Sequence, residues 1–397
     1  MRSFLLSVLA FVGAGCSFNV HGLPPGAGDA GVDDMAVSID LSTDPGDLAM
    51  SMPAGDLAMM PATDLATKPG RRKSITIDDT KVNGNQTDFP VWIDLTDADI
   101  GARAQASGHD IYFTAADGTT PLDYEIQRWD GNAHRLEAWV RVPALSNNQP
   151  TVLYVYYGDP SATATPNAPG VFKSSFAAVW HLDDKLPATT IAEATGTHAG
   201  TPNLTTTTQT AAKLGGGLAF NGGNDTITFT NPLSGNQAHT ISVWVNQAAT
   251  THPSAIIVMG TAAMSQARWL YGHFMTAVMA VGYYTNDWTT GTNLDGAGWT
   301  LVHWVLEGPN GKNHLYVNGA EITGSPMMLN GINTQGTSGV IGHAPEPAFG
   351  TNMGLNGTID ELRVATAARS AGWIATEYAN QSSPATFYTV GAEEPVP

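Results

Sequence analysis

The chain has 397 residues, of which 35 are acidic and 17 are lysine or arginine, so its formal net charge is −18. A chain this acidic repels the phosphates of nucleic acids and of anionic lipid headgroups, and we expect neither as a partner. The single cysteine excludes an intramolecular disulfide and a zinc site built on cysteines. Only 13% of the residues are charged, and 43 glycines and 24 prolines imply many turns, a composition typical of extracellular β-sandwiches.

Residues 1–16 have the parts of a secretory signal peptide: a positive charge at Arg2, a short apolar run, and small residues before Cys16. The apolar run is too short to cross a bilayer as a helix. The end of the segment resembles a bacterial lipobox, although Gly13 stands where an aliphatic residue is usual. The resemblance implies that Cys16 is lipidated and anchors the protein to the bacterial outer membrane, displayed on the cell envelope. The alternative is ordinary signal cleavage beside an incidental cysteine.

Residues 17–70 predict a disordered tether. The segment holds eight aspartates and one lysine, and a short Asp-Leu-Ala unit recurs at Asp47, Asp56 and Asp64. Such a composition cannot bury enough apolar surface to offset the entropy of ordering the chain. We expect an extended spacer that holds the folded domains clear of a membrane surface.

Residues 71–165 contain short runs of alternating apolar residues with turn signals between them, which predict an antiparallel β-sandwich. The clearest run is Phe89–Leu95, in which Val91, Ile93 and Leu95 share one face. The order FPVWIDL, DIYFTAADGTTPLDYEIQRWD, AWVRVPAL and VLYVYYGDP resembles DUF2341, a bacterial domain of unknown function that often precedes laminin G-like modules.

Residues 170–393 form the second predicted module. Its stretches LAFNGGND, TISVWV, LYVNG and GTIDELRV followed by ARSAGWIATEYANQ resemble, in this order, bacterial concanavalin A-like (laminin G-like) jelly rolls. The resemblance covers about residues 176–392 and implies a jelly-roll sandwich. The predicted fold is therefore all-β, with two antiparallel β-sandwich domains after a signal peptide and a disordered tether.

The end of the second module predicts a strand followed by a helix. Ile359, Leu362 and Val364 are the apolar positions of the strand, and Ser370 can cap the helix that follows. We expect this helix, at residues 370–379, to be the only regular helix of the mature chain.

Two adjacent acidic pairs, Asp183-Asp184 and Asp360-Glu361, are the candidates for carboxylate chemistry. Neighbours in a regular strand point to opposite faces, so neither pair is expected to act on one substrate. Retaining glycosidases need two carboxyl groups about 5 Å apart on one face. The E-x-D-x-x-E strand motif of jelly-roll glucanases is absent from the sequence. These observations favour a protein that is not an enzyme.

The resemblance also implies a calcium ion, because related sandwiches often hold one Ca²⁺ at a sheet edge. Asp360 stands at the matching position, and the segment around Asp183 could supply further oxygen ligands, which suit Ca²⁺. The alternative is that Asp360 accepts backbone hydrogen bonds or pairs with Arg363. Zinc is not expected, because the eleven histidines form no H-x-H or H-E-x-x-H pattern.

The segment GYYTNDW at 282–288 is the candidate ligand site. It places Trp288 and Tyr284 beside the short polar side chains of Asn286 and Asp287. A ring can stack on the apolar face of a sugar while short polar groups bond to its hydroxyls. Tryptophan in a sandwich is nevertheless more often part of the core. The sequence leaves both interpretations open for Trp288.

These sequence features indicate only the general class of function. A non-catalytic recognition or adhesion lipoprotein of the cell surface, which binds carbohydrate or a surface protein through its jelly roll, fits the tether and the lack of a catalytic motif. A glycan-processing enzyme of the glycoside hydrolase type and a purely structural envelope component are the alternatives. The fold itself does not choose among them, because it hosts many functions.

Overall fold

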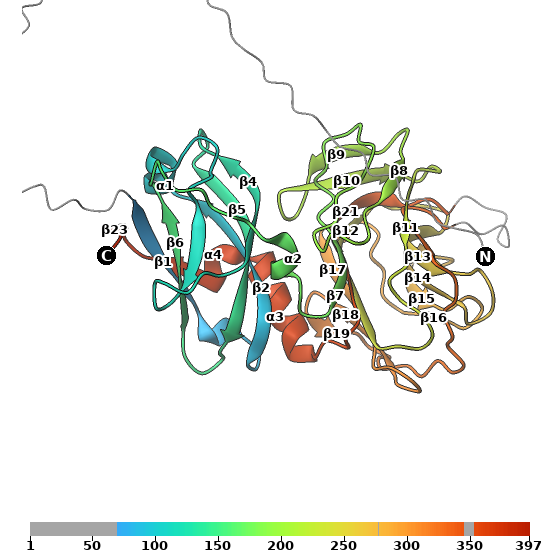
Figure 1. The fold of residues 1–397 in the computed structure, drawn as a ribbon. Coiled ribbons are helices and arrows are strands. Elements are labelled where there is room, and N and C mark those ends of the chain that lie inside the picture. Colours follow the sequence, from blue (N-terminus) through green and yellow to red (C-terminus); the bar gives the residue numbers. More distant parts are fainter. Residues whose placement is uncertain (1–69, 277, 345–352) are drawn as a thin grey trace, which may run out of the picture. The chain divides into compact units, whose positions relative to one another are not determined.

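The computed structural model describes residues 70–276, 278–344 and 353–397. The predicted signal peptide, Cys16 and almost all of the predicted tether lie outside the described residues. The described chain is nearly all β, and it forms antiparallel sheets arranged as two sandwiches, which confirms the predicted fold class (Figure 1). No described helix has the length and apolar character needed to cross a membrane.

The first sandwich packs a five-stranded sheet against a three-stranded one. The larger sheet has the order β22-β1-β6-β3, with β23 also paired to β1, and the smaller has the order β2-β5-β4. Its strands are β1 (Arg71–Ile77), β3 (Tyr112–Ala115), β6 (Thr151–Tyr157), β22 (Tyr388–Val390) and β23 (Glu394–Pro395), then β2 (Gln86–Thr96), β4 (Tyr124–Asp130) and β5 (Arg135–Leu145). The alternating residues Val91, Ile93 and Leu95 are buried in its core, as the period of two predicts.

The jelly roll packs an eight-stranded sheet against a seven-stranded one. The eight-stranded sheet contains β7 (Phe176–Trp180), β9 (Thr208–Ala211), β10 (Gly216–Asn221), β12 (His239–Gln247), β17 (Thr300–Leu306), β18 (Asn313–Val317), β19 (Ala320–Glu321) and β21 (Asn356–Ala365). The seven-stranded sheet contains β8 (Thr201–Asn203), β11 (Thr226–Thr230), β13 (Ser254–Gly260), β14 (Ala267–Phe274), β15 (Val278–Gly282), β16 (Asp287–Thr289) and β20 (Ser338–Ile341). Aliphatic and aromatic side chains fill the space between these two sheets.

Helices are short and few, but there is more than one. The predicted clasp helix is α3 (Ala371–Ser382), and the Ser370 hydroxyl accepts a hydrogen bond from the Trp373 backbone N–H. The prediction that it is the only regular helix is wrong, because the chain also forms the short helix α1 (Ala98–Arg103), which Asp97 caps. The other helical turns are one 3₁₀ turn and two short helices. Their bounds are η1 (Asp79–Lys81), α2 (Ala168–Val171) and α4 (Pro384–Phe387).

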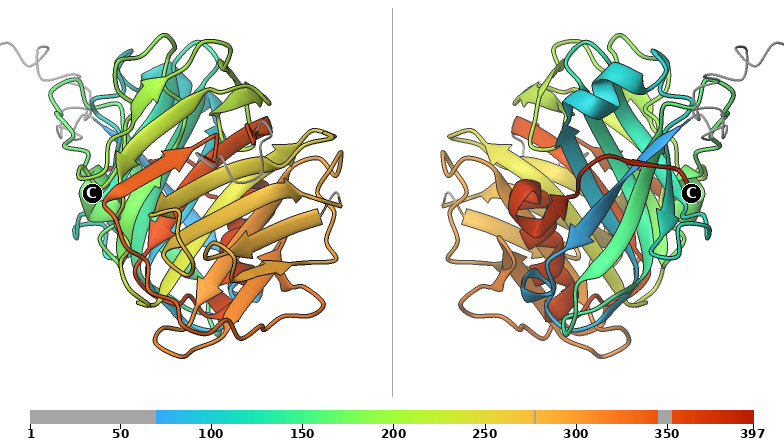
Figure 2. Two further views of the ribbon diagram at one scale, coloured as in Figure 1. Left: turned by 90° about the vertical axis from the view of Figure 1, so that its right-hand side faces the viewer. Right: turned by 90° about the vertical axis from the view of Figure 1, so that its left-hand side faces the viewer.

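The C-terminal segment returns to the first sandwich. Strand β22 pairs with β1, with Ile75 opposite Val390, and Tyr388 is buried in the core of the first sandwich. The structure thus places these residues in the first sandwich, whereas the sequence predicts a second module that extends to residue 393. The physical reason is that β22 continues the five-stranded sheet at the edge of β1, a pairing between distant segments. The right-hand view of Figure 2 shows this segment in dark red beside the blue strand β1.

Helix α3 packs against both sandwiches. Trp373 belongs to the core of the first sandwich, while Ile374 packs on Val305 and Tyr316 of the jelly roll. The side-chain amide of Asn380 bonds to both backbone groups of Trp92 in β2, at 2.7 and 3.0 Å. The described chain therefore carries its two sandwiches within one compact unit.

Candidate ligand-binding site

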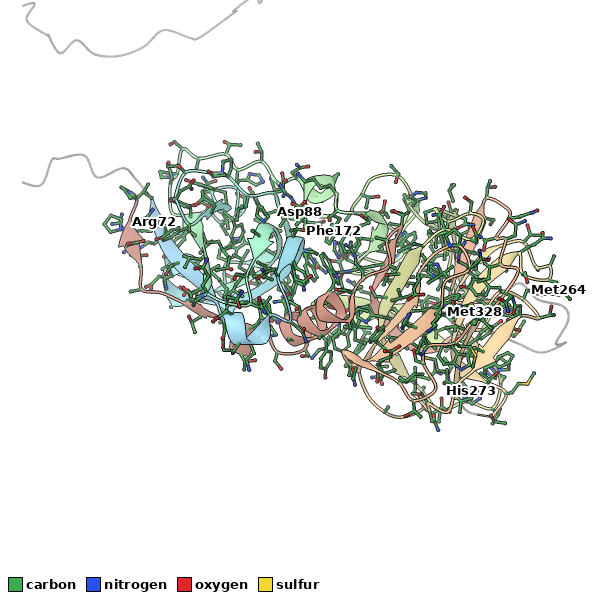
Figure 3. The ribbon with its side chains drawn as sticks, turned by 90° about the horizontal axis from the view of Figure 1, so that it is seen from below. Arg72, Asp88, Phe172, Met264, His273 and Met328 are labelled. Atoms are coloured by element: carbon green, nitrogen blue, oxygen red, sulfur yellow. The ribbon has the colours of Figure 1, made fainter. Side chains whose placement is uncertain are left out.

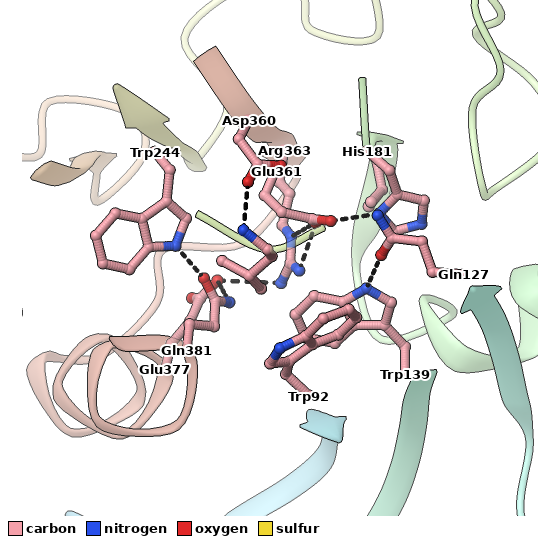
Figure 4. A network of polar contacts seen from close by, with 12 residues as sticks. Trp92, Gln127, Trp139, His181, Trp244, Asp360, Glu361, Arg363, Glu377 and Gln381 are labelled. Atoms are coloured by element: carbon pink, nitrogen blue, oxygen red, sulfur yellow. Dashed lines mark hydrogen bonds and ion pairs between the residues drawn. The ribbon is translucent and has the colours of Figure 1, made fainter. Parts of the chain in front are cut away.

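A buried network of charged residues lies where the two sandwiches meet (Figure 4). Arg363 in β21 is its centre, with its guanidinium nitrogens 2.8 Å from the Glu361 carboxylate and 3.1 Å from that of Glu377 in α3. His181, just after β7, lies between the two sandwiches. Its Nδ1 is 2.6 Å from Glu361 and its Nε2 is 3.1 Å from Glu125 in β4. Side chains from both sandwiches thus share one ion network.

A β-bulge explains why adjacent acidic residues reach this junction together. Strand β12 pairs with β21, and the register of this pairing shifts between Ser242 and Trp244. Glu361 lies in β21 at this shift, and its φ is +52°. Ile359 and Leu362, three positions apart, both point into the jelly-roll core. Asp360 and Glu361 therefore both lie on the outer side of the sheet, and the expectation that neighbours point to opposite faces is wrong here.

The two carboxyl groups at the bulge differ in charge. Burial and the neighbouring Glu361 hold the pKa of Asp360 well above its usual value. Burial acts in the same direction on Glu361, but His181 and Arg363 outweigh it and lower the pKa of that carboxyl. For His181 burial acts in the opposite sense and would lower the pKa. The Glu361 and Glu125 carboxylates outweigh it and hold the pKa of His181 well above the usual histidine value. The network therefore contains a charged Glu361 between two cations.

Aromatic rings enclose the network. The Arg363 guanidinium lies 4.2 Å from the centre of the Trp139 ring, and the Trp139 Nε1 donates a hydrogen bond to Gln127 Oε1 at 3.1 Å. Phe172, which Figure 3 shows between the sandwiches, packs edge-on to Trp139. On the other side, Trp244 Nε1 donates to Gln381 of α3 at 2.7 Å. These contacts hold the network and Gln127 in place.

A polar cleft of about 500 Å³ opens beside this network. Strands β4 and β5 of the first sandwich form one wall, and the segments around β9 and β10 of the jelly roll form the other. The lining residues are Gln127, Arg128, Glu137, Asp183, Gln209, Thr210, Ala211, Gly215 and Gly216. The cleft is thus lined by two carboxyl groups, one guanidinium group, two side-chain amides and a hydroxyl group, which come from both sandwiches. Such a set can donate and accept several hydrogen bonds at once.

Glycine residues let the backbone approach the cleft closely. Gly215 has φ +73°, a conformation that residues with a side chain rarely adopt. A Cβ atom on Gly215 would lie 3.4 Å from Glu137 Oε2, and one on Gly216 would lie 3.1 Å from the Asp183 Cβ. Side chains at these two positions would take up room beside both carboxyl groups.

Glu137 is the most unusual group in the cleft. The residue is fully buried, and its Oε1 lies 2.7 Å from the Arg135 guanidinium. Its Oε2 has no hydrogen-bond partner among the residues that the structure describes. Burial raises the pKa of Glu137, and burial likewise raises the pKa of Asp183 against the opposing effects of His181 and Gln127. A buried acceptor without a partner is costly, so a ligand hydroxyl that bonds to it would be favoured.

The predicted ligand segment does not present a free tryptophan. Trp288 is 7% exposed and lies in the core between the two jelly-roll sheets, so the prediction that it stacks on a ligand is corrected to a role in packing. The Asp287 carboxylate accepts hydrogen bonds from Trp269 Nε1 and the Tyr283 backbone N–H. The segment is thus a turn held by its own bonds.

The other two predicted residues of this segment also make local contacts. Tyr284 is half-buried, has φ +66° and packs on the Trp269 ring. The Asn286 side-chain amide donates to Ser265 Oγ and to the Asn330 carbonyl. The physical reason for the difference is register: Trp288 takes the inward position of β16, and the polar residues before it close the turn.

The calcium prediction rests on Asp360 and Asp183. Asp360 is fully buried and accepts a hydrogen bond from the Leu214 backbone N–H at 2.7 Å, as the alternative interpretation predicts. Asp183 lines the cleft, which Asp360 does not. Within residues 70–276, 278–344 and 353–397, no three acidic, histidine or cysteine side chains form a group that could hold a metal ion. Because Ca²⁺ takes six to eight oxygen ligands, these residues alone do not fit it, and calcium stays a prediction.

Comparison with known proteins agrees with the two sandwiches. Residues 107–184 match the family model of a domain of unknown function, DUF2341, and residues 221–375 match that of the concanavalin A-like lectin/glucanases superfamily. Both domains are present in this chain. No curated protein matches the sequence.

Solved structures resemble parts of the chain at low identity. Domain 4 of AbnA, a GH43 extracellular arabinanase from Geobacillus stearothermophilus solved with arabinotriose, is 21% identical, with a TM-score of 0.38 over 52% of this chain and 98% of that one. The binding domain of Paraclostridial Mosquitocidal Protein 1 is 11% identical, with a TM-score of 0.41 over 52% of each chain. A Trypanosoma rangeli sialidase in complex with 2,3-difluorosialic acid is 11% identical, with a TM-score of 0.41 over 63% of this chain and 42% of that one. This chain thus spans about half of the toxin domain and less of the sialidase.

Proposed function

We propose that this protein is a non-catalytic recognition protein and that it binds carbohydrate in the cleft between its two sandwiches. The observation that carries the proposal is the buried Glu137 carboxylate, which lines the cleft with one oxygen lacking a partner among the described residues. The concanavalin A-like fold of the jelly roll is consistent with a sugar ligand. The ion network beside the cleft is fixed by packing before any ligand arrives, which lowers the entropic cost of binding.

The chemistry of the cleft suits a neutral sugar. Sugar hydroxyls both donate and accept, and the cleft offers the Glu137 and Asp183 carboxyl groups as acceptors and the Gln209 amide as a donor. The Gln209 amide already bonds to the Asp183 carbonyl at 2.6 Å, so its position is set by the protein. The glycine backbone at 215–216 leaves room for a ring against the cleft floor.

The location of the protein is part of the same proposal. Lipidation at Cys16 would anchor the chain to a bacterial outer membrane, and the tether would place the cleft where it meets an external glycan or a surface protein. Changing Cys16 to Ser should release the protein from the membrane fraction or leave the precursor uncleaved. Unchanged membrane fractionation of this variant would refute the anchor.

A glycan array tests the binding class. The purified protein is applied with and without added calcium, and the Asp183→Asn variant is run beside it. We expect binding to a restricted set of oligosaccharides, weakened by about 1.5 to 3 kcal/mol in the variant because a charged acceptor is lost. Asn148→Ala, a change in the exposed turn between β5 and β6, should leave binding unchanged.

One observation favours an enzyme as the second candidate. Glu137 and Asp183 line the same cleft, and burial raises the pKa of both, as a general acid of a glycoside hydrolase requires. An incubation with each bound oligosaccharide, followed by a reducing-sugar measurement, separates the two candidates. Binding without release of reducing ends supports recognition, whereas release that Glu137→Gln abolishes would make the protein a hydrolase.

A further inference from the structure

A second pocket, of about 590 Å³, lies within the first sandwich. It is bounded by the edge strand β3, the start of β4 and the segment at 162–167 that leads away from β6. Rings and apolar groups make up one part of its lining, and uncharged polar groups make up another. Its characteristic members are Tyr112, Pro121, Tyr124, Thr163, Pro166 and Asn167.

The walls of this pocket are held by hydrogen bonds between distant segments. The Ala164 backbone N–H donates to the His109 carbonyl at 2.6 Å, and the Asn167 backbone N–H donates to the Tyr124 carbonyl at 2.8 Å. Tyr112 stands on β3 with one ring face stacked on Tyr156, at 4.8 Å between ring centres and 10° between planes. Because Tyr156 lies on β6 and β3 is the edge strand beside it, the opposite face of the Tyr112 ring is turned away from β6, and Tyr112 lines the pocket. The pocket therefore has a fixed aromatic wall.

Tyr124 supplies a polar group without a partner. Its side chain is 4% exposed and its hydroxyl has no hydrogen-bond partner among the residues that the structure describes. Burial raises the pKa of this phenol to about 12, so the hydroxyl is neutral at physiological pH. A neutral hydroxyl can both donate to and accept from a ligand hydroxyl.

The charge of the pocket is already balanced. Its one carboxylate, Asp123, lies 2.6 Å from the Arg141 guanidinium and also accepts a hydrogen bond from the Asn167 side-chain amide at 2.7 Å. No net charge is therefore left to attract an ionic ligand. An aromatic wall, proline rings and uncharged hydrogen-bonding groups together match a neutral molecule with one apolar face and several hydroxyls, which describes a sugar ring.

We propose that this pocket of the first sandwich is a second carbohydrate-binding site, in which a neutral sugar ring lies against Tyr112 and bonds to the Tyr124 hydroxyl. The site belongs to the first sandwich alone, so it does not depend on a ligand in the cleft at the junction. A protein with two separate sugar sites can bind a polymeric glycan more tightly than either site does alone.

The test uses the purified protein and a panel of neutral arabino-, xylo-, cello- and galacto-oligosaccharides, with dissociation constants from isothermal titration calorimetry. Tyr124→Phe keeps the ring and removes only the hydroxyl. We expect it to weaken binding of the responding oligosaccharide at this site at least tenfold while the melting temperature stays the same or rises. Tyr112→Ala should weaken the same site, because it removes the aromatic wall.

Two control variants separate this site from the others. Tyr154→Phe, at a tyrosine of the same sheet that does not line this pocket, should leave binding unchanged. Glu137→Gln should leave this site intact and weaken only the binding at the junction, so the two proposals fail or succeed separately. Unchanged affinity in both Tyr124→Phe and Tyr112→Ala would overturn the inference, as would a panel in which no oligosaccharide binds outside the junction. Binding of a proline-rich peptide in place of sugar, lost in Tyr112→Ala, would also overturn it.

Discussion

The core of the jelly roll and the junction between the sandwiches are both buried, but they are built from different chemistry. The space between the jelly-roll sheets is filled by aliphatic and aromatic side chains. The junction instead buries Arg363, Glu361, Glu377 and His181 beside tryptophan rings. An apolar core responds mainly to lost volume, whereas an ion network responds to lost charge and to pH. The junction is also where the polar cleft opens, so its chemistry determines what can bind there.

Removal of the central cation tests the junction most severely. Arg363→Met keeps a long apolar stem but leaves the Glu361 and Glu377 carboxylates without their partner. We expect a loss of about 3 to 5 kcal/mol in the free energy of unfolding, measured by urea denaturation, because an uncompensated buried charge is costly. Arg128→Met, at an exposed pair with Asp130, serves as control and should cost at most about 1 kcal/mol. Equal losses in the two variants would contradict the special role of the junction.

A loss of similar size is expected in the apolar core. Trp288→Ala deletes a large buried ring between the jelly-roll sheets and should cost about 3 to 5 kcal/mol of stability. The same urea measurement applies, at the pH that gives maximal stability. Ligand affinity of the folded fraction should be unchanged. A stable Trp288→Ala protein with weakened sugar binding would restore this residue to the ligand site and refute its place in the core.

Dependence on pH separates the two regions further. The pKa of His181 is raised in the folded protein. The stability that its ion pairs contribute is therefore fully present below pH 6.5, the ordinary histidine pKa, and is lost as the pH rises through the folded pKa. The pKa of Glu377 is lowered to about 2, against burial, by the hydrogen bond from His303 and by nearby cations. The stability that the ionised Glu377 contributes is therefore present above pH 4.5, the ordinary glutamate pKa, and is lost as the pH falls towards 2. Stability should therefore be highest between these limits.

Urea denaturation across the pH range measures this profile. In His181→Gln, the decline on the alkaline side should become smaller, and the part of the acid-side decline that comes from Glu361 should also become smaller, because His181 helps to lower the pKa of that carboxyl. An identical profile for the variant and the wild type would show that the His181 pair contributes nothing to the junction.

The smallest expected effect is at the cap of α3. Ser370→Ala removes the side-chain acceptor for the Trp373 backbone N–H and should cost about 1 kcal/mol of stability. Ser370→Asp, which keeps an acceptor, is the matched control and should retain stability. A melting temperature that does not respond to Ser370→Ala would mean that packing of α3 against the two sandwiches alone sets the helix start.

Much of the fold could be predicted from local patterns. Alternating residues such as Val91, Ile93 and Leu95 identify a half-buried strand, and Ser370 before an apolar stripe identifies the start of α3. The return of β22 to the first sandwich could not be predicted in this way, because strand pairing between residues 75 and 390 leaves no local signal. Short helices such as α1 are similarly hard to predict, since one capping aspartate resembles a turn.

The site was less predictable than the fold. The spacing of Ile359 and Leu362, three residues rather than two, is the mark of the bulge that turns Asp360 and Glu361 to the same side. Glu137 carries a weaker clue, because it stands in β5 between Leu136 and the apolar run Ala138–Val140, which is buried. The remaining polar groups of the cleft come from strands that are distant in the sequence, Gln127 from β4 and Gln209 and Thr210 from β9. Only the packing of the two sandwiches brings these strands to one cleft.

The most direct test of the central claim is a calorimetric titration of the wild type and of Glu137→Gln with one oligosaccharide selected on the array. The substitution keeps the shape of the side chain and replaces the buried carboxyl group at the cleft by an amide. The proposal predicts a weakening of about 1.5 to 3 kcal/mol in binding free energy, with the melting temperature of the variant close to that of the wild type. Glu394→Gln, at the edge of the first sheet, controls for the loss of one negative charge. Equal dissociation constants for wild type and Glu137→Gln would contradict the assignment of the cleft as the carbohydrate site.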